Sequence, residues 1–231
     1  MNRRQTNTKW PELAWDLVVD KVSKCTFRIY AGKSAGTGFV VSLGSDKKQS
    51  IKYLMMVTAW HVVKGVIDND EPIRFVSADK KISIGEKSGA CGIVRLGPPE
   101  FDIALVMFGM RKSILSKKEL LPMLPYESVL ARGAEIGWIG FPGLVEPELC
   151  FFKGVVSGYL NDPPTYLVDG VAINGVSGGP VFDNRAHLIG IVSAYIPNRL
   201  DESNVLPGLM AAVPITAVRY WMERQLKATI L

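Results

Sequence analysis

The hexapeptide GVSGGP, residues 175–180, surrounds a single serine with three glycines and ends in proline. Glycine adopts backbone conformations that other residues resist, so this hexapeptide predicts a tight turn. Such a turn can expose the hydroxyl of Ser177 and direct the N–H groups of Gly175 and Ser177 at one point. An ordinary glycine-rich turn explains the hexapeptide equally well when it is considered alone. Its role therefore depends on the residues that the rest of the chain supplies.

A serine nucleophile needs a base that takes its proton. The sequence contains two histidines, His61 and His187. His61 ends an apolar strand in the segment TAWHVV, residues 58–63, where its ring can face a cleft. A hydrogen-bonded core histidine is the alternative for His61. His187 lies between a polar turn and an apolar strand, and we interpret it as a surface or core histidine.

The base in turn needs a carboxylate that orients it, and Asp102 opens the apolar segment FDIALV, residues 101–106. A carboxylate buried without a partner is costly, so a buried Asp102 should have one. The ring N–H of His61 would serve, and this pair would fix the tautomer that a base requires. A position in the turn before the strand is the alternative explanation for Asp102.

Strand patterns dominate the chain from residue 26 to residue 215. Residues 38–43 and 51–58 are rich in β-branched and aromatic side chains, and a polar loop with a glycine joins them, which predicts a hairpin. Many short strands separated by turns are typical of all-β sandwiches and barrels. Residues 11–23 and 216–230 place apolar side chains at helical spacing, which predicts a helix near each end of the chain.

The order of these segments carries a resemblance to a known family. A histidine in Thr-Ala-x-His-Val, then Asp-Ile-Ala-Leu, then Gly-x-Ser-Gly-Gly-Pro is similar to the chymotrypsin/trypsin clan of serine proteases. Four further segments resemble the HtrA/Deg branch of this clan: GTGFVV (36–41), IGFPG (139–143), GVVS (154–157) and VAIN (171–174). No PDZ-type segment follows these motifs in the sequence, so we expect a protease domain alone.

The resemblance covers residues 22–226 and implies an all-β fold. It implies two six-stranded antiparallel β-barrels with the site in the cleft between them, together with a C-terminal helix. The proline-containing segment SKKELLPMLPYES is the best candidate for a linker between the barrels. We therefore expect an N-terminal arm and helix (1–24), an N-terminal barrel (25–115), a linker (116–128), a C-terminal barrel (129–215) and a C-terminal helix (216–231).

The resemblance also implies roles for individual residues. The catalytic triad would be His61, Asp102 and Ser177, and the oxyanion hole would be the N–H groups of Gly175 and Ser177. The substrate-binding pocket would be walled by the segment before the serine and by a later strand. Its residues would be Val171, Ala172, Ile173, Ser193, Ala194 and Tyr195.

The composition is that of a folded globular protein, with 48% hydrophobic and 21% charged residues among 231. No apolar run reaches the ~18 residues of a membrane helix, so we expect no membrane partner. The net charge of +5 is spread over scattered basic pairs, which argues against a nucleic-acid partner. The three cysteines form no metal-ligand spacing and predict reduced thiols in the cytoplasm. We expect no metal and no cofactor, and the oligomeric state stays open.

The sequence thus predicts a serine endopeptidase that cleaves polypeptides through an acyl-enzyme intermediate. Asp169 is the acid nearest before Ser177, and the rest of the expected pocket is apolar or small. A basic substrate side chain would need a carboxylate there, so we expect cleavage after small or medium aliphatic residues. The alternative is a catalytically inactive barrel of the same fold that acts as a peptide-binding module.

Overall fold

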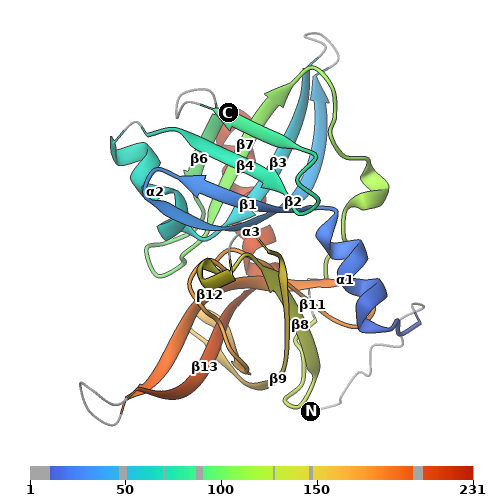
Figure 1. Cartoon of the computed structure of the whole chain (residues 1–231), viewed down its shortest axis with the longest axis vertical. Helices are drawn as coiled ribbons and strands as arrows, with labels where there is room; N and C mark the ends of the chain where they lie inside the picture. The colour runs from blue at the N-terminus through green and yellow to red at the C-terminus, as the bar shows by residue number, and fades with distance from the viewer. Residues whose placement is uncertain are drawn as a thin grey trace.

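The computed structural model describes residues 11–46, 51–69, 71–86, 91–126, 128–145, 148–199 and 205–230. Two β-rich halves follow one another along the chain, and Figure 1 shows them stacked along the long axis of the molecule. All pairings between named strands are antiparallel. Among the described residues, no helix is both long enough and apolar enough to cross a membrane.

The N-terminal half is a seven-stranded sheet in the order β5-β4-β1-β2-β3-β7-β6. Its strands are β1 (Thr26–Ala31), β2 (Ser34–Asp46), β3 (Ile51–Thr58), β4 (Ile73–Ser77), β5 (Ser83–Glu86), β6 (Cys91–Arg95) and β7 (Ala104–Met110). The predicted hairpin is the β2–β3 pair, with Val40 opposite Met56. Aromatic rings contribute to the core of the sheet, where those of Phe75 and Phe108 meet edge to face at 4.6 Å.

The C-terminal half is a closed six-stranded barrel in the order β10-β13-β12-β11-β8-β9. Its strands are β8 (Glu135–Gly140), β9 (Cys150–Asn161), β10 (Pro164–Asp169), β11 (Pro180–Phe182), β12 (Leu188–Arg199) and β13 (Val205–Pro214). One closed barrel is therefore present, whereas the second six-stranded barrel that we expected is not shown. Within the described residues, the edge strands β5 and β6 of the seven-stranded sheet do not pair with each other.

Helices occur near both ends of the chain, as predicted, and each one contacts the opposite half. Helix α1 (Trp15–Ser23) packs on the C-terminal barrel, where the Trp15 ring lies 5.4 Å from that of Phe151. Helix α3 (Ile215–Ile230) leaves β13 and returns to the N-terminal half (Figure 1). There the Trp221 ring lies 6.3 Å from that of Phe101, next to Asp102. Both halves are thus connected by helices, and α3 lies next to the segment that carries Asp102.

The prediction that His61 ends a strand was wrong. Strand β3 ends at Thr58, and the ten-residue helix α2 (Trp60–Asn69) begins two residues later. Val62, Val63 and Val66 lie on its buried face, at helical spacing. His61 therefore belongs to the first turn of a helix.

Candidate active site

Asp102 holds His61 at two points. Oδ1 accepts a hydrogen bond from the main-chain N–H of His61 at 2.8 Å, and Oδ2 lies 2.5 Å from its ring nitrogen Nδ1. An ionised carboxylate only accepts hydrogen bonds, so a neutral His61 ring in this contact carries its proton on Nδ1 and its lone pair on Nε2. The side chains of His61 and Asp102 are 46% and 27% exposed. The pair is therefore partly open to solvent.

The main chain around Asp102 fixes this geometry from both sides. The carbonyl of Asp102 accepts a hydrogen bond from the N–H of Trp60 at 3.1 Å, directly before His61. The next residue, Ile103, accepts one from Leu96 at 3.0 Å. The start of α2 and the start of β7 are thus joined through Asp102. This junction positions the carboxylate beside the helix that carries His61.

The segment around Ser177 is a tight turn that requires glycine at two positions. Gly175 and Gly178 have φ angles of +96° and +84°, a region that residues with a side chain rarely adopt. A Cβ atom on Gly178 would lie 2.1 Å from the carbonyl oxygen of Thr37. The N–H of Gly178 donates to the carbonyl of Val192 at 2.7 Å, which anchors the turn to β12.

Thr37, in β2 of the other half, anchors the turn from the opposite side. Its Oγ1 donates to the carbonyl of Gly175 at 2.8 Å and accepts from the N–H of Phe141 at 3.1 Å. Its own N–H donates to the carbonyl of Ser177 at 2.9 Å. Thr37 is fully buried. One side chain therefore connects the turn around Ser177, the end of β8 and the N-terminal sheet.

The turn lies against the segment that leads into helix α2. An ideal Cβ on Gly178 would be 2.7 Å from the nitrogen of Ala59, two residues before His61. An ideal Cβ on Gly36 would be 2.5 Å from a methyl of Val62 and 3.2 Å from the carbonyl oxygen of Ser177. Ser177 and His61 are therefore brought to one region. Among the described residues, no hydrogen bond joins the Ser177 hydroxyl to the His61 ring.

The predicted oxyanion-hole donors, the N–H groups of Gly175 and Ser177, differ from the neighbouring amides in their hydrogen bonding. Among the described residues, neither the N–H of Gly175 nor that of Ser177 donates a hydrogen bond, although the neighbouring Val176, Gly178 and Gly179 amides all do. A main-chain amide without an acceptor is costly unless water or a ligand supplies one. These two N–H groups are thus available to an oxygen atom in the site.

An apolar pocket of about 550 Å³ lies beside this turn. Three of the predicted pocket residues line it, together with three residues that we did not predict. The lining residues are Gly143, Leu144, Val171, Ala172, Ile173 and Asn174. Leu144 and Val171 are 85% and 53% exposed, so the mouth of the pocket is apolar as well.

The other predicted pocket residues, Ser193, Ala194 and Tyr195, belong to strand β12. Ser193 and Ala194 are not among the described residues that line this pocket. The side chain of Tyr195 lies outside the described part of the structure. Asp169 ends β10, is exposed, and does not line the pocket either. The wall is supported from behind by Trp138, whose buried indole N–H donates to the carbonyl of Val171 at 3.2 Å.

Comparison with known proteins shows the family and the fold of the chain. The family described as the trypsin-like peptidase domain matches residues 36–191. The chain belongs to this family. Its structure is similar to that of the serine endoprotease from Yersinia pestis, with a TM-score of 0.66 over 94% of this chain and 68% of that one. The two sequences are 16% identical, so the similarity shows a shared fold. No curated protein sequence matches the chain.

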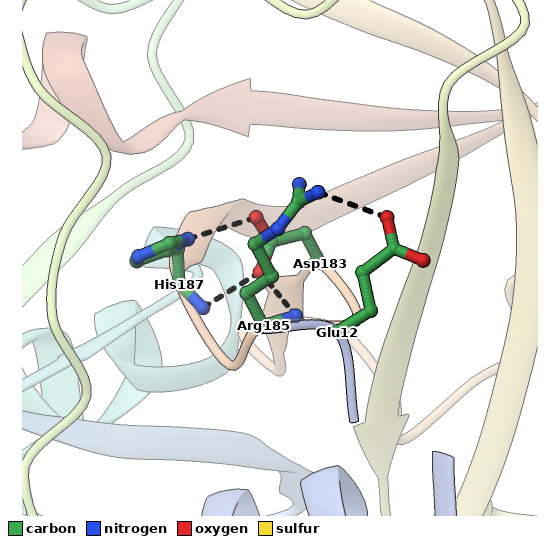
Figure 2. Close-up of polar contacts among 4 residues, drawn as sticks. All are labelled: Glu12, Asp183, Arg185 and His187. Carbon is green, nitrogen blue, oxygen red and sulfur yellow. Dashed lines mark hydrogen bonds and ion pairs between the residues drawn. The ribbon is translucent and has the colours of Figure 1, made fainter. Parts of the chain in front are cut away.

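This trypsin-like peptidase contains a second histidine–aspartate pair (Figure 2). Nδ1 of His187 lies 2.9 Å from Oδ2 of Asp183, and Oδ1 of Asp183 accepts from the main-chain N–H groups of Arg185 and His187. The side chains of His187 and Asp183 are only 7% and 13% exposed. Arg185 forms an ion pair with Glu12 at 2.9 Å, which ties the N-terminal segment to this turn. The pair stabilises a turn, in agreement with our interpretation of His187.

Two features of the candidate site were not predicted from the sequence, namely the contacts of Thr37 and the position of Gly143 and Leu144 at the pocket. In the sequence, Thr37 looks like any other polar residue of a strand. The two residues that its hydroxyl contacts, Gly175 and Phe141, are more than 100 residues away. Gly143 and Leu144 reach the pocket because Gly143 donates a main-chain hydrogen bond to Asn174 at 2.9 Å. The motif IGFPG at residues 139–143 contains the only local signal for this contact, since proline and glycine mark a turn.

Proposed function

We propose that this trypsin-like peptidase is a serine endopeptidase with His61, Asp102 and Ser177 as its triad. The observation that carries the proposal is the two-point contact between Asp102 and His61 beside the turn that holds Ser177. A ring fixed through Nδ1 leaves Nε2 free to accept the proton of the Ser177 hydroxyl. That hydroxyl oxygen then attacks the carbonyl carbon of the scissile peptide bond.

The negative charge that develops on the carbonyl oxygen needs donors at the moment of attack. The N–H groups of Gly175 and Ser177 would supply them, since neither donates within the described residues. The C–N bond then breaks, His61 gives its proton to the leaving amine, and the acyl group stays on Ser177 as an ester. Water attacks this ester with the help of His61, which releases the acid and restores the hydroxyl.

The preference for the residue before the scissile bond follows from the apolar pocket. Among the described residues that line it, none carries a carboxylate, and Asp169 lies on the exposed outer side of β10. A buried lysine or arginine side chain without a counter-charge is costly. We therefore propose cleavage after alanine, valine or leucine. The discrimination between these residues should be broad, because one methylene is worth only about 1–3 kcal/mol.

An inactive peptide-binding module is the second candidate function. It is favoured by one observation, the missing hydrogen bond between Ser177 and His61 among the described residues. Catalytic hydrogen bonds are often long or poorly aligned without substrate, so this observation does not decide the question. A fluorophosphonate probe distinguishes an active peptidase from an inactive module, because it labels only an activated serine.

The experiment is labelling of the purified chain, with the modified residue located by mass spectrometry. We expect a single adduct on Ser177 and no adduct in Ser177→Ala. Asp102→Asn should slow the labelling strongly, because the ring of His61 then loses its orientation. An unlabelled wild-type chain that still binds peptides would favour the inactive module.

A further inference from the structure

A pocket of about 260 Å³ lies where the outer face of the N-terminal sheet meets Phe141 of the other half. Three of its lining residues are basic, namely Arg28, Arg74 and Lys80. Among the described residues that line it, none is acidic. Nothing in the proposed catalytic mechanism uses this basic pocket.

The register of the strands explains why the cations gather. Arg28 and Tyr30 are two residues apart on β1 and so lie on one face of the sheet. Val76 is opposite Arg28 on β4, and Arg74 is opposite Tyr30. Directly opposite residues of an antiparallel pair share a face. Two strands therefore bring two guanidinium groups to one place.

Both guanidinium groups stack on the same aromatic ring. The Cζ atoms of Arg28 and Arg74 lie 4.8 Å and 4.5 Å from the centroid of the Tyr30 ring. The ring attracts each cation, but the two positive charges repel one another. An anion bound between them would remove this repulsion. An arginine guanidinium suits this purpose, because its planar fork matches a carboxylate or a phosphate.

The described acidic groups near the pocket, Glu148 and Asp79, pair with lysines and not with Arg74. Glu148 meets Lys80 at 3.5 Å, and both side chains are more than half exposed, where ion pairs are screened by solvent. Asp79 accepts hydrogen bonds from Ser77 and from the main chain of Lys81, and it forms an ion pair with the Lys81 side chain at 3.4 Å, so its charge is already paired outside the pocket lining. Within the described part of the chain, Arg74 has no ion pair. Its charge is available to a ligand.

The pocket is next to the proposed active site. Phe141, which closes one side of it, donates its N–H to Thr37 Oγ1, and the same oxygen donates to Gly175. Arg28 is directly opposite Thr37 in the β1–β2 pair, so both side chains lie on one face. A peptide bound in the cleft could therefore reach the basic pocket a few residues from the scissile bond.

We propose that the basic pocket binds an anionic side chain of the polypeptide substrate, at a position outside the scissile bond. This inference rests on the proposed function, and it adds acidic polypeptides as the preferred substrates. A carboxylate and a phosphorylated hydroxyl share the chemistry that the arginines recognise. A nucleic acid fits less well, because a nucleic-acid groove follows the backbone over several charges, whereas this pocket is a single small hollow.

The test measures binding on the Ser177→Ala chain, so that no probe is cleaved. The probes are fluorescent peptides with an Ala-Val-Leu core and four glutamates on either its amino or its carboxyl side. Matched peptides carry glutamine or phosphoserine in place of glutamate. We expect one glutamate peptide to bind at least about tenfold more tightly than its glutamine counterpart, and this difference to shrink as salt is added. Tighter binding of the phosphoserine peptide would assign the anion to phosphate.

Two substitutions of Arg74 and one control substitution test whether the preference for the acidic peptide comes from the basic pocket. Arg74→Glu should abolish the preference for the acidic peptide, and Arg74→Gln should weaken it. Both variants should fold, because Arg74 is exposed and its replacement leaves the core intact. Lys112→Glu changes the net charge by the same amount at an exposed position outside the pocket and should keep the preference. Thermal unfolding checks that all three variants fold.

Equal binding of glutamate and glutamine peptides would overturn the proposal. So would the same loss in Lys112→Glu as in Arg74→Glu, because net charge alone would then explain it. Binding of a single-stranded RNA that depends on Arg74, without any preference for acidic peptides, would assign the pocket to nucleic acid instead. Labelling of Ser177 by a fluorophosphonate is measured separately on the unchanged chain, so the proposed function and this inference can fail independently.

Discussion

Thr37 and Gly175 are 138 residues apart in the sequence, and a 2.8 Å hydrogen bond joins the hydroxyl of the first to the carbonyl of the second. This bond crosses from the N-terminal sheet to the turn that presents Ser177. The carbonyl of Gly175 belongs to the peptide unit directly before Val176, so the bond restricts how the main chain enters the turn. The proposed oxyanion hole is therefore held by a residue that does not take part in the chemistry.

Replacing Thr37 with valine should impair both stability and catalysis. The variant removes the hydroxyl but keeps the shape, which leaves the Gly175 carbonyl and the Phe141 N–H without their partner. Each buried polar group left unsatisfied costs about 1–3 kcal/mol, and a displaced oxyanion donor lowers kcat by roughly 10²-fold or more. Urea unfolding and peptide cleavage measure the two effects. Thr37→Ser keeps the hydroxyl and should retain most of both, and equal losses in the two variants would contradict the role of the hydroxyl.

The two histidine–aspartate pairs should respond differently to substitution. His61→Ala should lower kcat by about 10⁴-fold or more, because the serine loses its base. His187→Asn should leave fluorophosphonate labelling of Ser177 intact but lower the melting temperature, because its ring contacts the buried carboxylate of Asp183. Labelling kinetics and thermal unfolding of both variants provide the comparison. Loss of labelling in His187→Asn under conditions where the variant is folded would show that the second pair also takes part in catalysis.

Local patterns predicted those parts of the fold that depend on neighbours in the sequence. The β2–β3 hairpin and the two terminal helices follow from periodicity over ten to twenty residues. Helix α2 was missed because it begins two residues after a strand and is itself rich in valine, a residue typical of strands. The seven-strand order was missed for another reason. The pairing of β1 with β4 joins residues almost fifty positions apart, which no local pattern encodes.

The same distinction applies to the candidate site. The sequence order His61, Asp102, Ser177 predicted a contact between the first two, and the structure contains it. Their catalytic roles stay predictions. The support from Thr37 and Trp138 could not be predicted, since each makes its hydrogen bond to a main-chain carbonyl more than thirty residues away. Main-chain carbonyls are the same in every residue type, so the sequence carries no signal for such contacts.

The buried thiol of Cys25 should be unreactive in the folded protein. Desolvation by burial raises the pKa of this thiol from about 9 to about 12, and only the thiolate reacts with iodoacetamide. At pH 8.5 we expect slow alkylation of Cys25 and faster alkylation of the partly exposed Cys150, as measured by mass spectrometry. In urea both should react at similar rates. Equally fast labelling of both thiols in the folded chain would contradict this prediction.

The raised pKa of Cys25 also makes stability depend on pH. Because the folded state binds this proton more tightly than the unfolded state, the contribution is fully present below about pH 9 and is lost as the pH rises toward 12. The free energy of unfolding should therefore fall over this range more steeply in the wild type than in Cys25→Ala. Parallel curves for the two proteins would show that the thiol does not titrate in this way.

Substitutions around the apolar pocket test which side chain it accepts. Val171 lines the pocket and is half exposed, so Val171→Asp would add a carboxylate at its wall. Because a carboxylate compensates a bound cation, this variant should shift cleavage in a peptide library from alanine, valine and leucine toward lysine and arginine. Asp169→Asn should leave the preference unchanged, because Asp169 is exposed and outside the lining. Cleavage of the wild type after lysine or arginine, lost in Asp169→Asn, would show that Asp169 reaches the substrate and that another pocket holds the side chain before the scissile bond.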